Sequence, residues 1–252
     1  MTRTARRRWS RELGSEIDGI AMAADGPVIV HDYDPPAGDR WMESAIPGKL
    51  ALLERATGEV KWVSPCEVGY GRGFGAGFGR KNDALVLGPS TNGHRAARMS
   101  LETGELIAAA DVPTFDEALV FQDVCVMSST KRVTAIDTES LRDRWRYSRE
   151  GERYHHIGRT GERVFLVFSG ESKRRGVLAL DANKGELVHV VLAPRQREIH
   201  DLAVDERGLV LLVGDLSSAL PPEILDGWLR ETPSAKSHGG RVPALFAVDP
   251  AA

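Results

Sequence analysis

The sequence predicts an all-β fold: a five-bladed β-propeller closed by pairing of the N-terminal strand with the C-terminal blade. Three observations lead to this prediction. A hairpin pattern repeats along the chain, each repeat contains four short apolar stretches typical of strands, and almost no segment has the periodicity of a helix. We therefore expect a single propeller domain over residues 1–252.

The repeat is clearest in its second hairpin. An apolar stretch enters a turn rich in Asp, Glu, Thr and Gly, and a second apolar stretch follows. Equivalent turns are roughly 36 to 46 residues apart in the middle of the chain, which is the size of a propeller blade. The hairpins are LERATGEVKW (53–62), SLETGELIA (100–108), AIDTESLRDRW (135–145) and ALDANKGELVH (179–189), with AVDP (247–250) as a partial copy.

Two further strands precede each hairpin, which makes four per blade. In chain order these pairs are IDGIAMA with GPVIVHDY, GFGAGFG with DALVLG, FDEALVF with DVCVMSS, YHHIG with ERVFLVFS, and IHDLAV with RGLVLLVG. The predicted blades span about 13–63, 64–111, 112–148, 149–193 and 194–252. A sixth blade would require a badly degenerate repeat.

The two ends of the chain are expected to share one sheet. RRRWSRE at residues 6–12 matches the fourth-strand segment DRWRYSREG at 143–151, whereas AVDP near the C-terminus matches a third strand with no fourth after it. Pairing of residues 6–12 with the fifth blade would close the ring and remove its exposed sheet edges.

The hairpin motif, of the type A-[IL]-D-x-x-[TK]-G-E-x-x-x-W, resembles the quinoprotein-like (PQQ-like) propeller repeat. It is carried by Thr57-Gly58-Glu59 with Trp62, by Thr103-Gly104-Glu105, by Asp137 with Trp145, and by Asp181 with Gly185-Glu186. The resemblance implies that Trp9, Trp62 and Trp145 dock flat between neighbouring blades. The resemblance to quinoprotein dehydrogenases would imply an exported, eight-bladed protein with a vicinal cysteine pair. In this chain the only two cysteines, Cys66 and Cys125, are far apart in the sequence. We therefore do not expect the quinone cofactor.

Composition excludes several classes of protein. With 33 Lys+Arg against 36 Asp+Glu, the net charge of -3 provides no general field for nucleic acid, so no nucleic-acid partner is expected. No apolar run approaches the roughly 18 residues of a membrane span, so no membrane partner is expected either. The basic N-terminus is not followed by the apolar stretch of a secretory signal, which favours a cytoplasmic location.

The first strand of each blade lines the channel of a propeller. Asp18, Asp116, His155 and His200 occupy nearly the same position in four of these strands. Imidazole and carboxylate groups around one axis suit a divalent metal of unknown identity, with His155, His200 and Asp116 also as catalytic groups. Alternatively, these side chains form hydrogen bonds along a water-filled channel. Their neighbours His156 and Asp201 face the other way and would contact the substrate or orient the imidazoles.

Two long loops, 31–48 and 215–240, are expected over one mouth of the channel, and residues 222–231 could form a short helix within the second. Long loops are functional or merely cover apolar surface. The side chains expected to wall or reach a pocket there are His31, Tyr33, Asp34, Trp41, Trp228 and His238. Arg72, in the glycine-rich segment 69–79, could contact an anionic substrate. Those glycines suit close backbone approach better than phosphate binding, because a strand and not a helix follows.

Two hypotheses for function follow. The first is an enzyme with its site at the channel mouth, a lyase, isomerase or hydrolase dependent on a divalent metal and acting on a polar small molecule. Paired carboxylates for glycoside hydrolysis could be chosen from Asp18, Asp116 and Glu117. The second is a non-catalytic scaffold that binds a protein or peptide partner. Loss of activity in His155→Ala or His200→Ala, or near-stoichiometric metal, would favour the enzyme.

Overall fold

The structure is a computed structural model. It describes residues 9–13, 16–22, 28–33, 46–70, 73–90, 93–121, 123–171, 175–192, 199–204, 210–216 and 242–248. Every regular element in these ranges is a β-strand, in agreement with the predicted all-β class. The residues predicted as a short helix, 222–231, lie outside the described residues.

The chain divides into two compact units. Unit 1 contains residues 1–127 and 134–144, and unit 2 contains residues 128–133 and 145–252. The boundary runs through the third sheet, so one hairpin tip and most of the last strand of that sheet belong to unit 2. The single domain expected over residues 1–252 stays a prediction.

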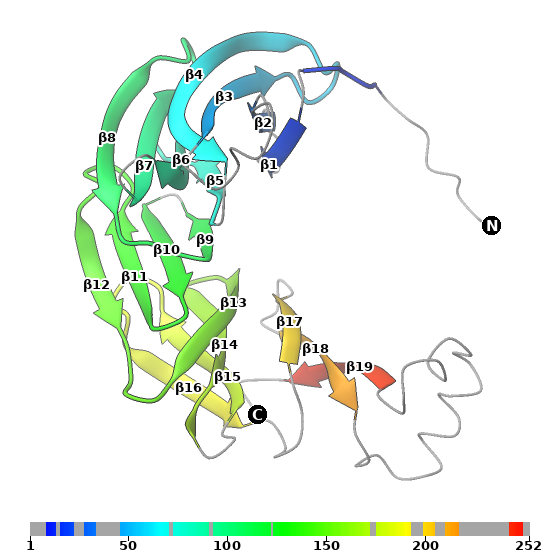
Figure 1. Ribbon diagram of the computed structural model, residues 1–252, viewed down its shortest axis with the longest axis vertical. Helices are drawn as coiled ribbons and strands as arrows, with labels where there is room; N and C mark the ends of the chain where they lie inside the picture. Colours follow the sequence, from blue (N-terminus) through cyan, green and yellow to red (C-terminus); the bar gives the residue numbers. More distant parts are fainter. Residues whose placement is uncertain are drawn as a thin grey trace, which may run out of the picture. The chain divides into compact units, whose positions relative to one another are not determined.

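Two four-stranded antiparallel sheets form the first part of unit 1 (Figure 1). In each, consecutive strands pair in chain order, as expected for a propeller blade. The first sheet contains β1 (Glu16–Met22), β2 (Val28–Tyr33), β3 (Ile46–Leu53) and β4 (Val60–Tyr70). The second contains β5 (Gly75–Phe78), β6 (Asp83–Ser90), β7 (Gly93–Ser100) and β8 (Leu106–Val112). β4 continues seven residues beyond the boundary expected at residue 63.

The third sheet has the same up-and-down order. Its strands are β9 (Glu117–Val120), β10 (Val124–Ser129), β11 (Arg132–Asp137) and β12 (Asp143–Tyr147). The two middle strands, β10 and β11, are buried on both faces, because residues of either parity are covered. Such strands read as continuous apolar runs, whereas the outer strand β12 keeps an alternation of exposed and buried positions.

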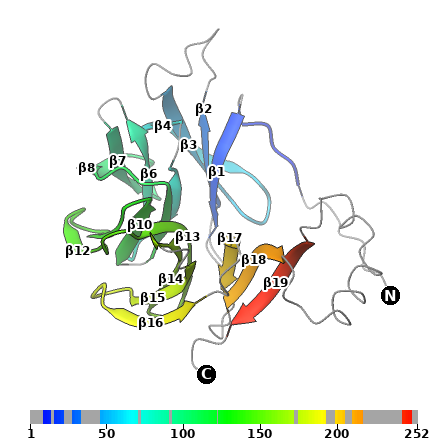
Figure 2. The ribbon, with the colours of Figure 1, turned by 60° about the horizontal axis from the view of Figure 1, so that its bottom comes forward.

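Unit 2 contains one complete and one three-stranded antiparallel sheet. The complete sheet is β13 (Arg153–Thr160), β14 (Arg163–Ser169), β15 (Arg175–Asp181) and β16 (Leu187–Leu192). The other is β17 (Ile199–Val204), β18 (Val210–Leu216) and β19 (Val242–Val248), and β17 lies against β13 and β14 (Figure 2). Residues 9–13 belong to no strand and residues 6–8 lie outside the described part. Neither the fifth blade as a complete sheet nor the closing pair is therefore seen.

The apolar core of unit 1 lies between consecutive sheets. One cluster joins the first sheet to the second, with Leu50, Leu52 and Val68 packed against Val86 and Met99. A second cluster joins the second sheet to the third, and in it Leu85 and Phe115 pack with Met127. The two clusters cover both faces of the second sheet, which explains why residues 84–87 of β6 are apolar at successive positions.

The tryptophan docking implied by the repeat is confirmed at three places. The Trp62 Nε1 of β4 donates to the carbonyl of Leu101 at 2.9 Å, and its ring covers Gly104 in the β7–β8 turn. The Trp145 ring of β12 likewise covers Gly185 in the β15–β16 turn, and its Nε1 donates to the Ala182 carbonyl at 2.9 Å. Trp9 donates to the Arg55 carbonyl at 2.8 Å, in the β3–β4 turn.

At the interface of the second and third sheets, a leucine and an alanine take the places of the glycine and the tryptophan. Leu141 stands in the turn where the other hairpins have glycine, and its N–H donates to the Asp137 carbonyl at 2.9 Å as those glycines do to theirs. It adopts a φ of 56°, which is unfavourable for a branched side chain. Where the neighbouring sheet would supply tryptophan, β8 has Ala108, and the freed space holds the buried Leu141 side chain.

The glycine-rich segment of blade two lets two strands approach closely. A Cβ on Gly75 would lie 2.7 Å from the Ala118 Cβ of β9, and one on Gly77 would lie 2.5 Å from the Val120 Cβ. Gly73, at a φ of 85°, would meet the Phe115 carbonyl oxygen at 2.3 Å. The expectation of close backbone approach is confirmed, because β5 packs against β9 without any side chain of its own at these positions.

Candidate functional site

Two of the four predicted ligands, Asp18 and His200, are the extra residues of β-bulges, which the sequence did not reveal. In β1 the pairing with β2 skips Asp18, and in β17 the pairing with β18 skips His200. In β13 the skipped residue is His156, because His155 pairs with Val167 and Ile157 pairs with Leu166. The residue equivalent to Asp18 and His200 is therefore His156, and the alignment that used His155 was wrong by one position.

The physical reason is that a bulge adds one residue to a strand and so changes which face the following side chains occupy. Simple alternation, counted along the sequence, cannot register it. At the β13 bulge, His156 has a φ of 42° and is half-buried, whereas His155 is exposed, and the centroids of the two rings are 6.5 Å apart. Bulges often stand beside functional sites because they redirect a side chain.

The other predicted residues are only partly placed. Asp116 is half-buried in the bend just before β9. Of the remaining predicted residues, five lie in strands whose backbone alone is described: Asp18, His31, Tyr33, His200 and Asp201. Those outside the described residues are Asp34, Trp41, Arg72, Trp228 and His238. Among the side chains that the structure does describe, no group of three or more His, Cys, Asp or Glu is placed to hold a metal ion. The metal site stays a prediction.

Among the described residues, two cavities lined by charged side chains each lie within one unit, and they differ in charge balance. The smaller, of about 180 Å³, lies in unit 1 between the second and third sheets. Its four cations are matched by four carboxylates: Arg80, Lys81, Arg98 and Arg144 against Asp83, Asp123, Asp137 and Glu139.

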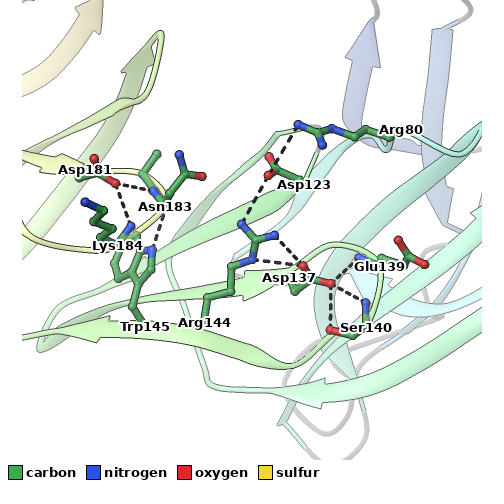
Figure 3. Close-up of polar contacts among 11 residues, drawn as sticks. Arg80, Asp123, Asp137, Glu139, Ser140, Arg144, Trp145, Asp181, Asn183 and Lys184 are labelled. Carbon is green, nitrogen blue, oxygen red and sulfur yellow. Dashed lines mark hydrogen bonds and ion pairs between the residues drawn. The ribbon is translucent and has the colours of Figure 1, made fainter.

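Ion pairs link these groups. The buried Arg98 holds Asp83 through two hydrogen bonds of 2.8 and 2.5 Å to one carboxylate oxygen. Arg144 bridges Asp137 at 2.7 Å and Asp123 at 3.5 Å, as Figure 3 shows. A buried ion pair with its hydrogen bonds satisfied has little attraction left for a ligand. In the smaller cavity this holds for the buried Arg98–Asp83 pair, and each of the more exposed cations also has a carboxylate partner.

Both oxygens of the Asp137 carboxylate in the smaller cavity accept hydrogen bonds. One oxygen accepts the backbone N–H of Ser140 at 2.7 Å and its hydroxyl at 2.8 Å, and the other accepts Arg144. Burial opposes ionisation of Asp137, but the hydrogen bonds from Ser140 and Arg144 outweigh it and lower its pKa to about 2. Asp181 caps the β15–β16 turn similarly, accepting the backbone N–H groups of Asn183 and Lys184 (Figure 3).

The larger cavity, of about 640 Å³, lies in unit 2 and has a surplus of positive charge. Its described lining comes from three parts of the chain: the β10–β11 turn, the β12–β13 turn with the first residue of β13, and residues 169–171 with Arg175. Its charged side chains among the described residues are Lys131, Arg149, Arg153 and Arg175 against Glu152 and Glu171, a net formal charge of +2. We refer to it as the basic cavity.

Tyr154 fixes the β12–β13 turn of the basic cavity. Its buried hydroxyl accepts the Arg149 backbone N–H at 2.8 Å and donates to the Glu152 carboxylate at 3.2 Å. Burial raises the pKa of this hydroxyl, so it stays protonated and remains a donor. The Tyr154 N–H donates to the Thr130 carbonyl at 3.1 Å, which ties the β10–β11 turn to β13. Two of the three connections are thus held in place from within.

Sequence reasoning missed the basic cavity. Its residues come from three turns that are far apart in the chain, and each turn alone reads as an ordinary solvated connection. A signal did exist, because the sequence places cations in all of those turns while the whole chain has a net charge of -3. Only the arrangement of the sheets shows that these turns lie at the same end.

Comparison with known proteins identifies the family. The family model described as outer membrane protein assembly factor BamB matches residues 47–219. The chain therefore belongs to this family of β-propellers with PQQ-like repeats, as the hairpin motif implied. Among solved structures it is similar to "The crystal structure of BamB from Moraxella catarrhalis", with 13% identity, a TM-score of 0.42, and coverage of 80% of this chain and 70% of that one. Among curated proteins, no significant match is found.

Proposed function

We propose that this chain is a non-catalytic propeller scaffold that binds a protein partner. The observation that carries the proposal is the family match over residues 47–219, whose description is that of an assembly factor. An assembly factor acts by holding other proteins, and propellers offer rigid turns on which such contacts are built. The expectation of a small-molecule enzyme has no comparable support from the family or from the described side chains.

We further propose that the scaffold is a five-bladed ring closed by residues 6–12 and β19. Trp9 supports this proposal, because it covers Gly58 in the same manner as Trp62 and Trp145 cover the turns of the sheets that follow theirs. In those two cases the tryptophan belongs to the fourth strand of a sheet. Trp9 thus occupies the place of a fourth strand that precedes the first sheet, and the sheet of β17, β18 and β19 has three described strands.

The experiment that tests the scaffold is purification of the full chain from its own cells under native conditions, with elemental analysis of the same sample. We expect the chain to elute with one protein in a fixed ratio, without stoichiometric divalent metal. His155→Ala and His200→Ala should leave that complex intact.

The opposite result would overturn the proposal. A chain that elutes alone, carries about one metal ion per molecule and loses turnover of a small molecule in either histidine variant is an enzyme. The predicted cytoplasmic location is tested by the same preparation: cell fractionation should recover the chain with soluble cytoplasmic markers. Within the part of the chain that the structure describes, no helix is suited to crossing a bilayer.

A further inference from the structure

The basic cavity has cations that its own surroundings do not neutralise. Within the described residues, the side chains of Lys131, Arg149 and Arg153 form no ion pair, although they line the same cavity. In the smaller cavity of unit 1, by contrast, every cation has a carboxylate partner. Unpaired cations gathered in a concave site attract anions, and guanidinium groups bind carboxylates through paired hydrogen bonds.

The distribution of charge in the basic cavity limits which kind of anion it can bind. Its described cations come from two turns and from the first residues of β13 and β15 around about 640 Å³, so the positive charge is distributed and not focused at one point. Glu152 and Glu171 stand among them and would repel a compact, doubly charged group such as phosphate. An extended peptide places alternate side chains on the same face at roughly 7 Å intervals, and can therefore present successive carboxylates to separate cations.

The β12–β13 turn of the basic cavity is also fixed in place before a ligand binds. Tyr154 anchors the turn that carries Arg149 and Glu152, and Gly151 in that turn has a φ of 73°. A Cβ on Gly151 would lie 3.0 Å from the Glu171 Cγ, so this turn packs closely against the β14–β15 connection. Preorganised turns lose little conformational entropy when a ligand binds.

We propose that the basic cavity binds an acidic segment of the partner protein in extended form. This inference rests on the proposed scaffold function and assigns the surface through which it acts. Arg149 and Arg153 bind the carboxylates of the segment, and Glu171 limits how much negative charge the site accepts.

The test uses the purified full chain and a short fluorescein-labelled peptide of alternating Glu and Ser, with binding followed by fluorescence anisotropy. We expect the Arg149→Gln/Arg153→Gln variant to bind at least about tenfold more weakly, and Glu171→Gln to bind about two- to threefold more tightly. The opposite signs at one site distinguish a specific effect from loss of folding. Binding should weaken as salt is added, because the contacts are ionic.

Arg163→Gln is the matched control. Arg163 is an exposed arginine at the opposite end of β14 from the cavity, so its loss removes the same charge from the same sheet and should change affinity by less than about twofold. A peptide of alternating Lys and Ser should not bind.

Three outcomes would overturn the inference: equal binding by wild type and the double-arginine variant, no binding of the acidic peptide, or displacement of that peptide by inorganic phosphate at matched ionic strength. The scaffold proposal would survive each of them. If the native complex also persists in Arg149→Gln/Arg153→Gln, the partner binds elsewhere on the chain.

Discussion

At the residue scale, the repeat depends on one contact between a tryptophan and a glycine. Gly58, Gly104 and Gly185 have φ values of 69°, 75° and 71°, and each is covered by a tryptophan ring from another segment. The glycine is required twice, because the left-handed backbone disfavours a side chain and the ring leaves no room for one. The indole N–H of the same tryptophan satisfies a carbonyl of the turn.

Gly185→Ala should therefore be strongly destabilising. The new Cβ would lie 2.5 Å from the Trp145 ring, and the φ of 71° adds backbone strain, so we expect a loss of at least about 2 kcal/mol in the free energy of unfolding. Denaturant unfolding measures it. Gly161→Ala is the control, since Gly161 has a φ of 53° with open space around it. This variant should lose only about 1 kcal/mol in the free energy of unfolding. Equal losses would show that the tryptophan contact is unimportant.

Asp137 gives a prediction for pH. Its pKa is lowered to about 2 in the folded chain from an ordinary value of 3.8, so its ionised form stabilises the fold above about pH 4. That contribution, about 2 kcal/mol, should be lost as the pH falls from about 4 to about 2. Asp137→Asn should cost this amount at pH 7 and almost nothing near pH 2, as measured by urea unfolding across the range.

Glu162→Gln serves as the control for Asp137→Asn. Glu162 is an exposed carboxylate in the β13–β14 turn, and its substitution should leave the pH dependence of unfolding unchanged. An Asp137→Asn variant with the wild-type pH profile would show that Arg144 and Ser140 do not hold the carboxylate in solution.

At the element scale, small side chains set how closely neighbouring sheets pack. The β5 strand has glycine where β9 presents Ala118 and Val120, so the two strands approach backbone to backbone. The sequence predicted the strand and the close approach from the run of glycines. It did not predict the partner, because β9 lies in a different repeat.

The contact of β5 with β9 can be tested by moving one methyl group. Gly75→Ala should destabilise the chain by about 1–3 kcal/mol, because the new Cβ would lie 2.7 Å from the Ala118 Cβ. Adding Ala118→Gly removes that methyl, and the nearest remaining atom is then 3.5 Å away. We expect the double variant to recover at least about 1 kcal/mol relative to the sum of the single changes. Additive losses in a double-mutant cycle would contradict the close approach of these two strands.

The bulges show the limit of sequence reasoning at this scale. Apolar alternation placed the first strands of the fourth and fifth sheets, and both are present as β13 and β17. The extra residue in each bulge lies within an otherwise regular pattern, so counting by twos assigned His155 to the row that His156 occupies. In β17 the residue that the pairing skips is His200 itself, and its place among the predicted ligands stays a prediction.

At the scale of the whole molecule, the proposed closure of the ring can be tested directly. If residues 6–12 pair with β19, the amides of Val242–Val248 that face away from β18 are hydrogen-bonded and should be protected from hydrogen exchange. Deletion of residues 1–13 should raise their exchange rate at least about tenfold while the amides of β14 stay protected. Exchange followed by mass spectrometry measures both. Equal exchange of β19 in the two chains would exclude the closing strand.

The sequence by itself determined the four-strand repeat, the hairpin turns with their tryptophan and glycine residues, and the family. These features are local: alternation of apolar residues, turn chemistry and a short motif are all written within one repeat. Only the tertiary structure decided which histidine occupies a bulge and which cations share a cavity. Lys131, Arg153 and Arg175 lie in a turn and at the starts of two different strands, and their charges act together only because folding brings these parts of the chain to one place.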